Sequence, residues 1–321
     1  MTKRCVPWLI LLACLIGLIG ALGPRVTIDT RLTAAALPQD LDAFLARREA
    51  SIPNLTPGTE KAIVWADEPD RRTVWAVVYL HGFSGSRQEA APLADRVAGA
   101  LGANLFYTRF TGHGRDGDAL LECSVNAWLN DAYEAYRIGE RLGDRVLLMG
   151  TSTGGTIATW LATRSETPAL GAVALLSPNF GLHDPKAAVL TWPWGGLIAE
   201  LGIGETRSWT PQNERHARYW THRYPTRALL PMAGMVKLVR QTDLAAARVP
   251  FLVIYSPNDR VVSPDATEAT FSRIGASRKK LVPYTGASNP AQHVLAGDIL
   301  APESTAPIAD LILDFVQTPA N

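Results

Sequence analysis

Hydrophobic positions in this chain recur with two spacings that alternate from residue 61 onward. Short apolar runs of the kind that form buried strands occupy residues 62–66, 73–80, 104–108, 145–149, 170–176, 251–255 and 279–282. Amphipathic patterns typical of helices lie between or after them, at residues 88–101, 125–142, 154–164 and 308–316. Strands that alternate with helices predict an α/β fold with a mostly parallel central sheet flanked by helices on both faces.

One segment, at about residues 181–248, interrupts this alternation. It is rich in Trp, Pro and Tyr and shows no clear strand pattern. An insertion between two core strands, at the sheet edge where chemistry is usually carried, predicts a lid over a binding site. A helical extension with structural aromatic residues is compatible with the same pattern, because a lid also needs a small apolar core. The aromatic candidates for substrate contact are Trp192, Trp194, Trp209 and Trp220.

The N-terminal region has a different character. Residues 6–23 are uncharged and rich in Leu, Ile, Ala and Gly, and Lys3 and Arg4 precede them. As a helix this run would be roughly 27 Å long, close to the thickness of a bilayer's hydrocarbon core. The preceding positive charges favour a main domain on the outer side. We therefore predict residues 1–23 to be a membrane anchor or signal segment, and the protein to be exported.

Two alternatives to an anchor stay open for this segment. A cleaved signal peptide would release the domain, although Pro24 disfavours cleavage directly after Gly23. A lipoprotein signal ending at Cys14 is the other alternative, but the apolar run continues beyond that cysteine. Residues 24–60 form the predicted stem, with a short helix at 40–49 whose apolar face docks on the main domain at 61–321.

Composition excludes several classes of protein. A chain of 321 residues with 47% hydrophobic content can bury the core of one α/β domain with an insertion. The net charge is +1, and no charge block or basic stripe supports a nucleic-acid partner. Three cysteines, Cys5, Cys14 and Cys123, form neither a disulfide framework nor a metal-binding pattern. We therefore expect no metal and no cofactor.

The strongest chemical signal is the pentapeptide Gly150-Thr151-Ser152-Thr153-Gly154. An apolar strand enters it and a small-residue helical pattern leaves it. In that context G-x-S-x-G indicates a nucleophile elbow, in which the hydroxyl of Ser152 projects above the sheet. The two glycines allow strand and helix to approach closely. Taken alone, the motif is also compatible with an ordinary strand-to-helix turn.

A serine hydroxyl becomes an effective nucleophile only beside a general base that an acid orients. Asp259 follows an apolar strand at the same sheet edge and is the predicted acid; a turn residue capping the strand end is the alternative. His293 follows the last strand and is the only histidine after Asp259, which makes it the predicted base. Asp298 is a rival acid, but it lies too close in sequence to His293 to reach the far side of the ring easily.

The oxyanion of an acyl-transfer intermediate needs donors that are already in place. One predicted donor is the backbone N–H of Thr153, directly after the nucleophile. The other is the N–H of Phe83, in the glycine-containing loop after the strand that ends at Leu80. His81 at the start of that loop is expected to hold the loop rather than to exchange protons.

Taken in this order, the motifs resemble the α/β-hydrolase superfamily, and within it the bacterial carboxylesterase and monoacylglycerol-lipase-like group. The resemblance covers roughly residues 61–316 and includes Gly112-His113-Gly114, similar to a structural loop of that family. It implies a serine ester hydrolase with a lid, in which Ser152 is acylated, Asp259 and His293 complete the triad, and water releases the acid. Small acylglycerols or similar carboxylic esters are the implied substrates.

Other functions remain open at this point. The same triad serves thioesterases, amidases and peptidases, and a catalytically silent binding protein with this fold is a hypothesis from another class. The expected partners are a small-molecule ester and, through the N-terminal segment, a membrane. The expected location is the bacterial inner membrane, with the domain facing the periplasm or the cell exterior, or secretion if the segment is cleaved.

Overall fold

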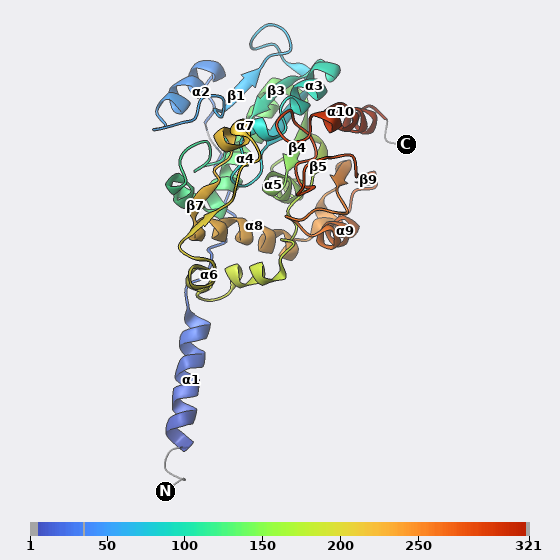
Figure 1. Ribbon diagram of the computed structural model, residues 1–321. Coiled ribbons are helices and arrows are strands. Elements are labelled where there is room, and N and C mark those ends of the chain that lie inside the picture. Colours follow the sequence, from blue (N-terminus) through green and yellow to red (C-terminus); the bar gives the residue numbers. More distant parts are fainter. Residues whose placement is uncertain (1–5, 35, 319–321) are drawn as a thin grey trace.

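A seven-stranded sheet runs through the centre of the computed structural model, which describes residues 6–34 and 36–318 (Figure 1). The strand order is β1-β3-β2-β4-β5-β8-β9; β1 pairs antiparallel with β3, and every other neighbouring pair is parallel. This confirms the predicted mostly parallel sheet. The strands are β1 (Ala62–Val64), β2 (Thr73–Leu80), β3 (Asn104–Tyr107), β4 (Gly143–Thr151), β5 (Leu170–Leu176), β8 (Phe251–Tyr255) and β9 (Lys279–Pro283).

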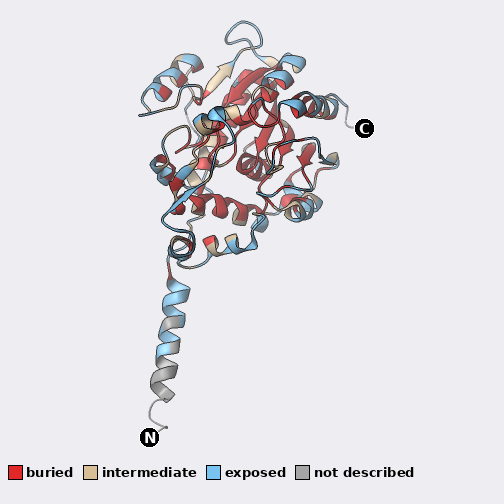
Figure 2. Ribbon diagram, viewed as in Figure 1, coloured by how far each residue is buried: buried red, intermediate tan, exposed pale blue. Residues whose placement is uncertain are grey.

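Helices cover both faces of this sheet, and the alternation of side chains along the strands explains the two layers. Val78 and Leu80 of β2 join the apolar core that contains residues of α4, α5 and α8, whereas Val77 and Tyr79 join the core that contains residues of α3 and α10. The central strands are therefore buried on both sides (Figure 2). The helices are α3 (Leu93–Leu101), α4 (Val125–Leu142), α5 (Thr153–Leu161), α8 (Leu229–Gln241), α9 (Pro264–Arg273) and α10 (Pro302–Gln317).

Two helices depart from the sequence-based expectation. The predicted helix at residues 88–101 is divided into a short 3-10 turn, η1 (Arg87–Glu89), and α3, because Pro92 stands at the boundary and cannot continue a helix. Helix α9 was not predicted from the hydrophobic pattern. Its start carries clear signals: Ser263 accepts a hydrogen bond from the N–H of Ala266 (3.2 Å), and Pro264 occupies the first turn.

The segment between β5 and β8 is mainly helical, but it also contains a small sheet. β6 and β7 pair antiparallel there, although no strand pattern was evident in the sequence. Helix α8 joins the insertion to the body by packing against α5, and its Met235 is fully buried. The elements are η3 (Pro185–Thr191), α6 (Gly195–Ile203), β6 (Thr206–Ser208), α7 (Glu214–Tyr219), β7 (Arg223–Pro225), η4 (Thr226–Ala228), α8 and η5 (Leu244–Ala246).

The N-terminal helix corrects the prediction of a membrane anchor. Helix α1 (Val6–Leu22) has 17 residues, and within residues 6–34 and 36–318 no helix is both long and apolar enough to span a bilayer. Pro24 disfavours helical geometry at Gly23, so the helix stops at about 26 Å. The predicted anchor is therefore wrong, and so are the membrane partner and the exported location that depended on it. Lys3 and Arg4, which had set the orientation, lie outside the described residues.

The stem carries the expected short helix, α2 (Leu41–Ala50). Asp40 caps its start by accepting a hydrogen bond from the N–H of Ala43 (2.8 Å). Leu41 and Leu45 are buried in the core that α4 also enters, and Phe44 packs beside them. The helix therefore docks its apolar face on the body.

Candidate active site

Ser152 stands in a sharp turn between β4 and α5. Its backbone has φ 51° and ψ −117°, a region that residues other than glycine rarely adopt. Three backbone hydrogen bonds hold the turn: Ser152 N–H donates to Leu176 O (3.0 Å), and Ser152 O accepts from Thr156 N–H (3.1 Å) and Asn179 N–H (3.0 Å). The strained conformation is thereby fixed from both sides.

The flanking glycines are required by the close approach of strand and helix. A Cβ on Gly154 would collide with the carbonyl oxygen of Leu80, and a Cβ on Gly150 would lie 2.8 Å from the Gly154 carbonyl group. Both contacts are with backbone, which cannot move aside easily. The geometry therefore has the features of the nucleophile elbow expected from the sequence.

Asp259, just beyond β8, and His293, in the segment that follows β9, form a hydrogen-bonded pair. His293 Nδ1 lies 2.7 Å from Asp259 Oδ2, and the Asp259 side chain is only 1% exposed. The other carboxylate oxygen, Oδ1, accepts the N–H groups of Val261 (2.8 Å) and Val262 (2.9 Å). Because the carboxylate is held by donors, Nδ1 is the protonated ring nitrogen and Nε2 is left with a lone pair.

Ser152 and His293 line one cavity of about 390 Å³. Phe83 and Thr153, the two predicted oxyanion donors, line it as well. Most of the remaining lining is apolar, and Arg207 of β6 is the one Lys, Arg, Asp or Glu side chain among the described lining residues. Asp259 lies behind His293 and is not part of the lining. The structure therefore gathers the predicted nucleophile, base and donors around a single space.

His81 orients the loop that carries Phe83. Its ring donates from Nδ1 to Gly82 O (2.9 Å) and accepts at Nε2 from the N–H of Phe110 (3.0 Å). Gly82 O also accepts the N–H of Gly85 (3.3 Å). Since the C=O and N–H of one peptide unit point in opposite directions, fixing Gly82 O also fixes the direction of the Phe83 N–H. Burial lowers the pKa of His81 well below its usual range, so the ring stays neutral.

Thr153 offers its N–H for a different reason. It is the first residue of α5, and the first N–H groups of a helix have no partner inside that helix. The helix dipole adds partial positive charge at the same end. Both predicted donors are thus backbone N–H groups rather than groups on mobile side chains.

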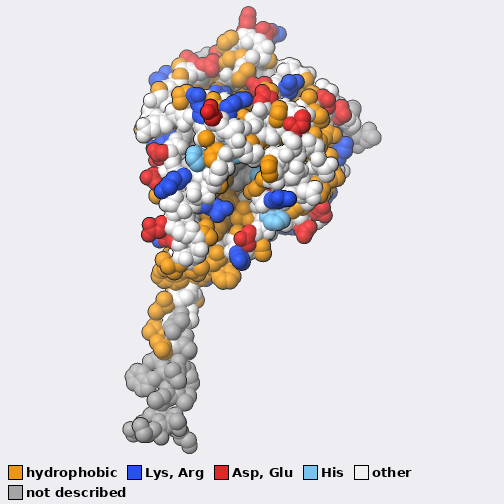
Figure 3. Space-filling model, in the orientation of Figure 1, with side chains coloured by type: hydrophobic (Ala, Val, Ile, Leu, Met, Phe, Trp, Pro, Cys, Tyr) orange, Lys and Arg blue, Asp and Glu red, His pale blue; other side chains and the backbone are white. Residues whose placement is uncertain are grey.

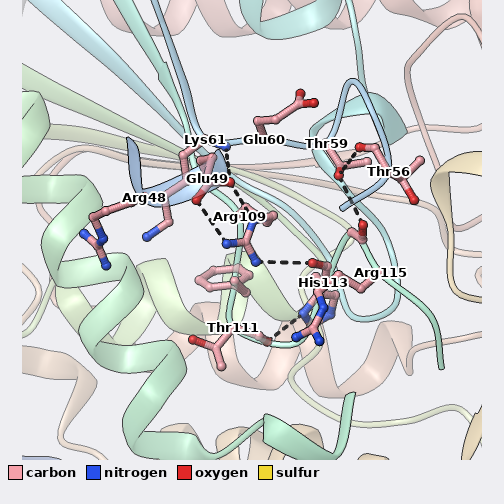
Figure 4. Close-up of polar contacts among 12 residues, drawn as sticks. Arg48, Glu49, Thr56, Thr59, Glu60, Lys61, Arg109, Thr111, His113 and Arg115 are labelled. Atoms are coloured by element: carbon pink, nitrogen blue, oxygen red, sulfur yellow. Dashed lines mark hydrogen bonds and ion pairs between the residues drawn. The ribbon is translucent and has the colours of Figure 1, made fainter. Parts of the chain in front are cut away.

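A second histidine supports the same loop. His113 accepts the N–H of Ser84 at Nε2 (3.0 Å) and donates from Nδ1 to Thr111 O (3.2 Å). Its carbonyl oxygen accepts from Arg109 Nη1 (3.3 Å), and Arg109 pairs with Glu49 of α2 through two bonds of 2.7 and 3.0 Å (Figure 4). Burial is the main cause that lowers the pKa of His113, to about 4. Both histidines therefore act as neutral braces at neutral pH.

The four tryptophans singled out in the insertion lie in two places. Trp209 and Trp220 line the cavity above Ser152. Trp192 is 58% exposed and Trp194 is 37% exposed, and both lie away from that cavity. Figure 3 shows hydrophobic side chains gathered at the end of the body that carries α6 and adjoins α1. Of these four tryptophans, only Trp209 and Trp220 are placed to contact a substrate beside Ser152.

Several residues at the site were not identified from the sequence. Glu89 is buried behind the Phe83 loop, where its Oε1 accepts the N–H of Gly82 (2.7 Å). His216 of α7 lines the cavity, accepts the N–H of Gln212 at Nδ1 (3.1 Å), and has its pKa lowered to about 4, mainly by burial. Within residues 6–34 and 36–318, no group of three or more His, Cys, Asp and Glu is placed to hold a metal ion.

Comparisons with known sequences agree with this geometry. Residues 71–288 match the family described as serine aminopeptidase, S33. A thermostable monoacylglycerol lipase from Bacillus sp. (strain H-257) is 27% identical over 208 residues, which cover 64% of this chain and 79% of that enzyme. The region matched to the family includes β2 to β9 and therefore the elbow and Asp259.

Solved structures share the fold. A metagenome-derived lipolytic enzyme superposes with a TM-score of 0.65 at 21% identity, covering 82% of this chain and 99% of the other. The monoacylglycerol lipase of Paleococcus ferrophilus gives 0.58 at 16% identity, covering 80% and 97%. The chain therefore belongs to the α/β-hydrolase family described as serine aminopeptidase, S33, within its monoacylglycerol-lipase and esterase group of ester-hydrolysing serine enzymes.

Proposed function

We propose that this enzyme hydrolyses small acylglycerols or similar carboxylic esters through a Ser152–His293–Asp259 triad and an acyl-enzyme intermediate. The observation that carries the proposal is the 2.7 Å contact between His293 Nδ1 and Asp259 Oδ2 behind a cavity that Ser152 also lines. It supports a base with a defined tautomer beside the cavity that Ser152 lines. The backbone of the elbow keeps the serine exposed to the same space.

The proposed chemistry follows from that tautomer. His293 Nε2 accepts the Ser152 proton as Oγ attacks the ester carbonyl, and Asp259 stabilises the imidazolium. The N–H groups of Phe83 and Thr153 stabilise the oxyanion. Collapse of the intermediate returns the proton from His293 to the departing alcohol. Water then repeats the sequence on the acyl-enzyme, releases the acid and restores Ser152.

The cavity supports a small, largely apolar substrate. Its volume of about 390 Å³ lies at the low end of the range for small-molecule sites. Trp209, Trp220 and Met232 supply apolar walls on the side of the insertion, which we propose to be a lid. The related Bacillus enzyme is named a monoacylglycerol lipase, which supports an acylglycerol as the substrate.

Hydrolysis of peptides is the main competing activity, because the matched family is described as an aminopeptidase. An aminopeptidase must bind a positively charged α-amino group. The formally charged lining residue here is Arg207, which repels such a group. The positive charge of Arg207 therefore favours a neutral ester substrate over a peptide with a free α-amino group.

Labelling and turnover together test the proposal. Wild-type protein and Ser152→Ala are incubated with a fluorophosphonate probe, and both are assayed with p-nitrophenyl butyrate, 1-monobutyrin and alanine p-nitroanilide. We expect labelling of wild type only, ester turnover lowered by several orders of magnitude in the variant, and no anilide turnover. Ser165→Ala, at a solvent-facing serine, is the matched control. Folded wild-type protein that is not labelled would refute the proposal.

A further inference from the structure

A carboxylate that the triad does not use lies directly behind the oxyanion loop. Glu89 ends the 3-10 turn η1, and its residue is only 3% exposed. Its Oε1 accepts two hydrogen bonds, from the N–H of Gly82 (2.7 Å) and from the hydroxyl of Tyr79 (2.9 Å). Gly82 is the residue before Phe83. The carboxylate therefore holds the loop that carries one predicted oxyanion donor.

The same carboxylate is connected to the nucleophile elbow. Tyr79 Oη lies 2.8 Å from the hydroxyl oxygen of Thr151. Because Tyr79 gives its single hydrogen to Glu89, Thr151 is the donor in this second contact. Thr151 directly precedes Ser152. One buried acceptor thus joins the two segments that supply the proposed oxyanion hole.

The glycines of the loop make room for this carboxylate. A Cβ on Gly85 would collide with Glu89 Oε2. A Cβ on Gly82 would lie 3.1 Å from Glu89 Oε2 and 3.1 Å from the Cβ of Ser152. Glu89 and Ser152 therefore face each other across Gly82, with no side chain between them.

The carboxylate of Glu89 interacts with His293, which lines the cavity. Burial raises the pKa of Glu89 to about 7, while hydrogen bonds from Gly82 and Tyr79 and the positive charge of His293 act in the opposite direction. Tyr79, which faces it from β2, stays neutral because burial raises the pKa of its hydroxyl well above the usual value. His293 is thus the group near Glu89 whose charge changes during the proposed reaction.

We propose that Glu89 is a positioning residue of the ester-hydrolysing site: it ties the oxyanion loop to the nucleophile elbow, and its negative charge stabilises the imidazolium form of His293. The inference rests on the proposed function, because it assigns the loop and His293 the roles given above. It adds a second carboxylate to the site, behind the loop that carries Phe83. Glu89 acts through Gly82, Tyr79 and His293 rather than on the substrate.

Glu89→Gln separates the charge from the shape of this residue. The amide keeps an oxygen for Gly82 and Tyr79 but cannot carry a negative charge. We expect kcat at pH 8 to fall on the order of tenfold, KM to stay nearly unchanged, and the acidic limb of the kcat/KM profile to move to lower pH. The limb moves because His293 loses its proton more easily without the nearby charge. Structural damage alone would lower the whole profile without moving the limb.

Glu89→Leu tests the tether. It leaves Gly82 N–H and the Tyr79 hydroxyl without their acceptor, so kcat and the rate of fluorophosphonate labelling should both fall about 100-fold. Glu68→Gln, on the exposed turn between β1 and β2, is the matched control and should behave as wild type. Thermal unfolding of each variant reports on folding, and Glu89→Gln alone decides if Glu89→Leu does not fold.

The outcomes separate this inference from the proposed function. Wild-type protein labelled at Ser152, together with a Glu89→Gln profile that superposes on that of wild type, would overturn the role of Glu89 and leave the esterase intact. Wild-type protein that folds but is not labelled would overturn the esterase itself. A shifted acidic limb in Glu89→Gln, with unchanged KM, supports the inference.

Discussion

Replacing Asp259 by asparagine tests whether the proposed acid works by fixing the tautomer of His293. In the structure, Asp259 Oδ1 accepts two backbone N–H groups, from Val261 and Val262, and Oδ2 accepts His293 Nδ1–H. The amide oxygen of the introduced asparagine must stay with the two backbone donors, because an amide nitrogen placed there would face two N–H groups. The amide nitrogen then points at His293 Nδ1 and donates to it. The ring proton moves to Nε2, which can no longer accept the Ser152 proton.

The size of the effect follows from this reversal. A histidine in the wrong tautomer costs a serine hydrolase about 10⁴-fold in kcat, which corresponds to about 5 kcal/mol of transition-state stabilisation. KM should change little, since Asp259 does not line the cavity. The fold should survive, because asparagine retains the oxygen that holds the turn at Val261 and Val262.

The assay is the hydrolysis of p-nitrophenyl butyrate at pH 8, with the rate of fluorophosphonate labelling as a second measure. Asp298→Asn is the matched control: Asp298 was the rival acid from sequence, and the structure leaves it exposed. Its kcat should stay within about twofold of wild type. An Asp259→Asn variant that keeps more than about a tenth of the wild-type kcat would refute the tautomer argument, as would an equal loss in Asp298→Asn.

Three further predictions concern stability and the cavity. The pKa of His113 is about 4 in the folded protein, so between about pH 6.5 and about pH 4 the unfolded chain binds a proton that the folded protein does not. The free energy of unfolding should therefore fall by about 1.4 kcal/mol for each pH unit between about 6.5 and about 4. Urea unfolding should show this slope in the difference in unfolding free energy between wild type and His113→Asn. Glu89, whose pKa is raised, changes the unfolding free energy in the opposite direction, but it does so in both proteins and cancels in the difference. A difference that does not depend on pH would contradict the prediction. Gly154→Ala should cost at least about 3 kcal/mol in urea unfolding, because its Cβ meets the backbone of Leu80, while Gly99→Ala, with open space around it, should be neutral or stabilising by up to about 1 kcal/mol. Equal stability of the two alanine variants would exclude the close approach at the elbow. Trp209→Ala should raise KM for p-nitrophenyl hexanoate about tenfold, and Trp192→Ala, outside the cavity, should not; equal effects would place the acyl chain elsewhere.

Local patterns in the sequence were sufficient for the strands of the central sheet and for the order of the motifs. The β-branched and apolar run at β2 predicts its bounds without error, because most of that strand is buried on both faces and its positions are constrained. The short strands β6 and β7 were missed since they carry polar residues such as Arg207 and Arg223, and their pairing depends on contacts between distant residues. The anchor prediction failed because, within residues 6–34 and 36–318, no helix is both long and apolar enough to span a bilayer.

The residues that support the proposed triad were harder to predict than the triad itself. Ser152, Asp259 and His293 follow strands, so chain order and the shared sheet edge bring them together. Glu89 stands near the start of a helical pattern, where an acidic residue is common for reasons of helix dipole alone. Its burial depends on where Gly82 and Tyr79 fold back on it, which no local pattern records.

The residues that hold the oxyanion loop also extend beyond the region matched to the family. Glu49 of α2 precedes residue 71, where that match begins, yet it pairs with Arg109 while both side chains are only 7% exposed. Arg109 in turn donates to the carbonyl oxygen of His113, whose ring accepts the N–H of Ser84. Removing Glu49 would leave a buried guanidinium without its anion. In comparable buried pairs, such a change lowers the free energy of unfolding by about 3–5 kcal/mol. Helix α2 is therefore tied to the hydrolase fold: Glu49 neutralises Arg109, which holds His113 and, through it, the loop that carries Phe83.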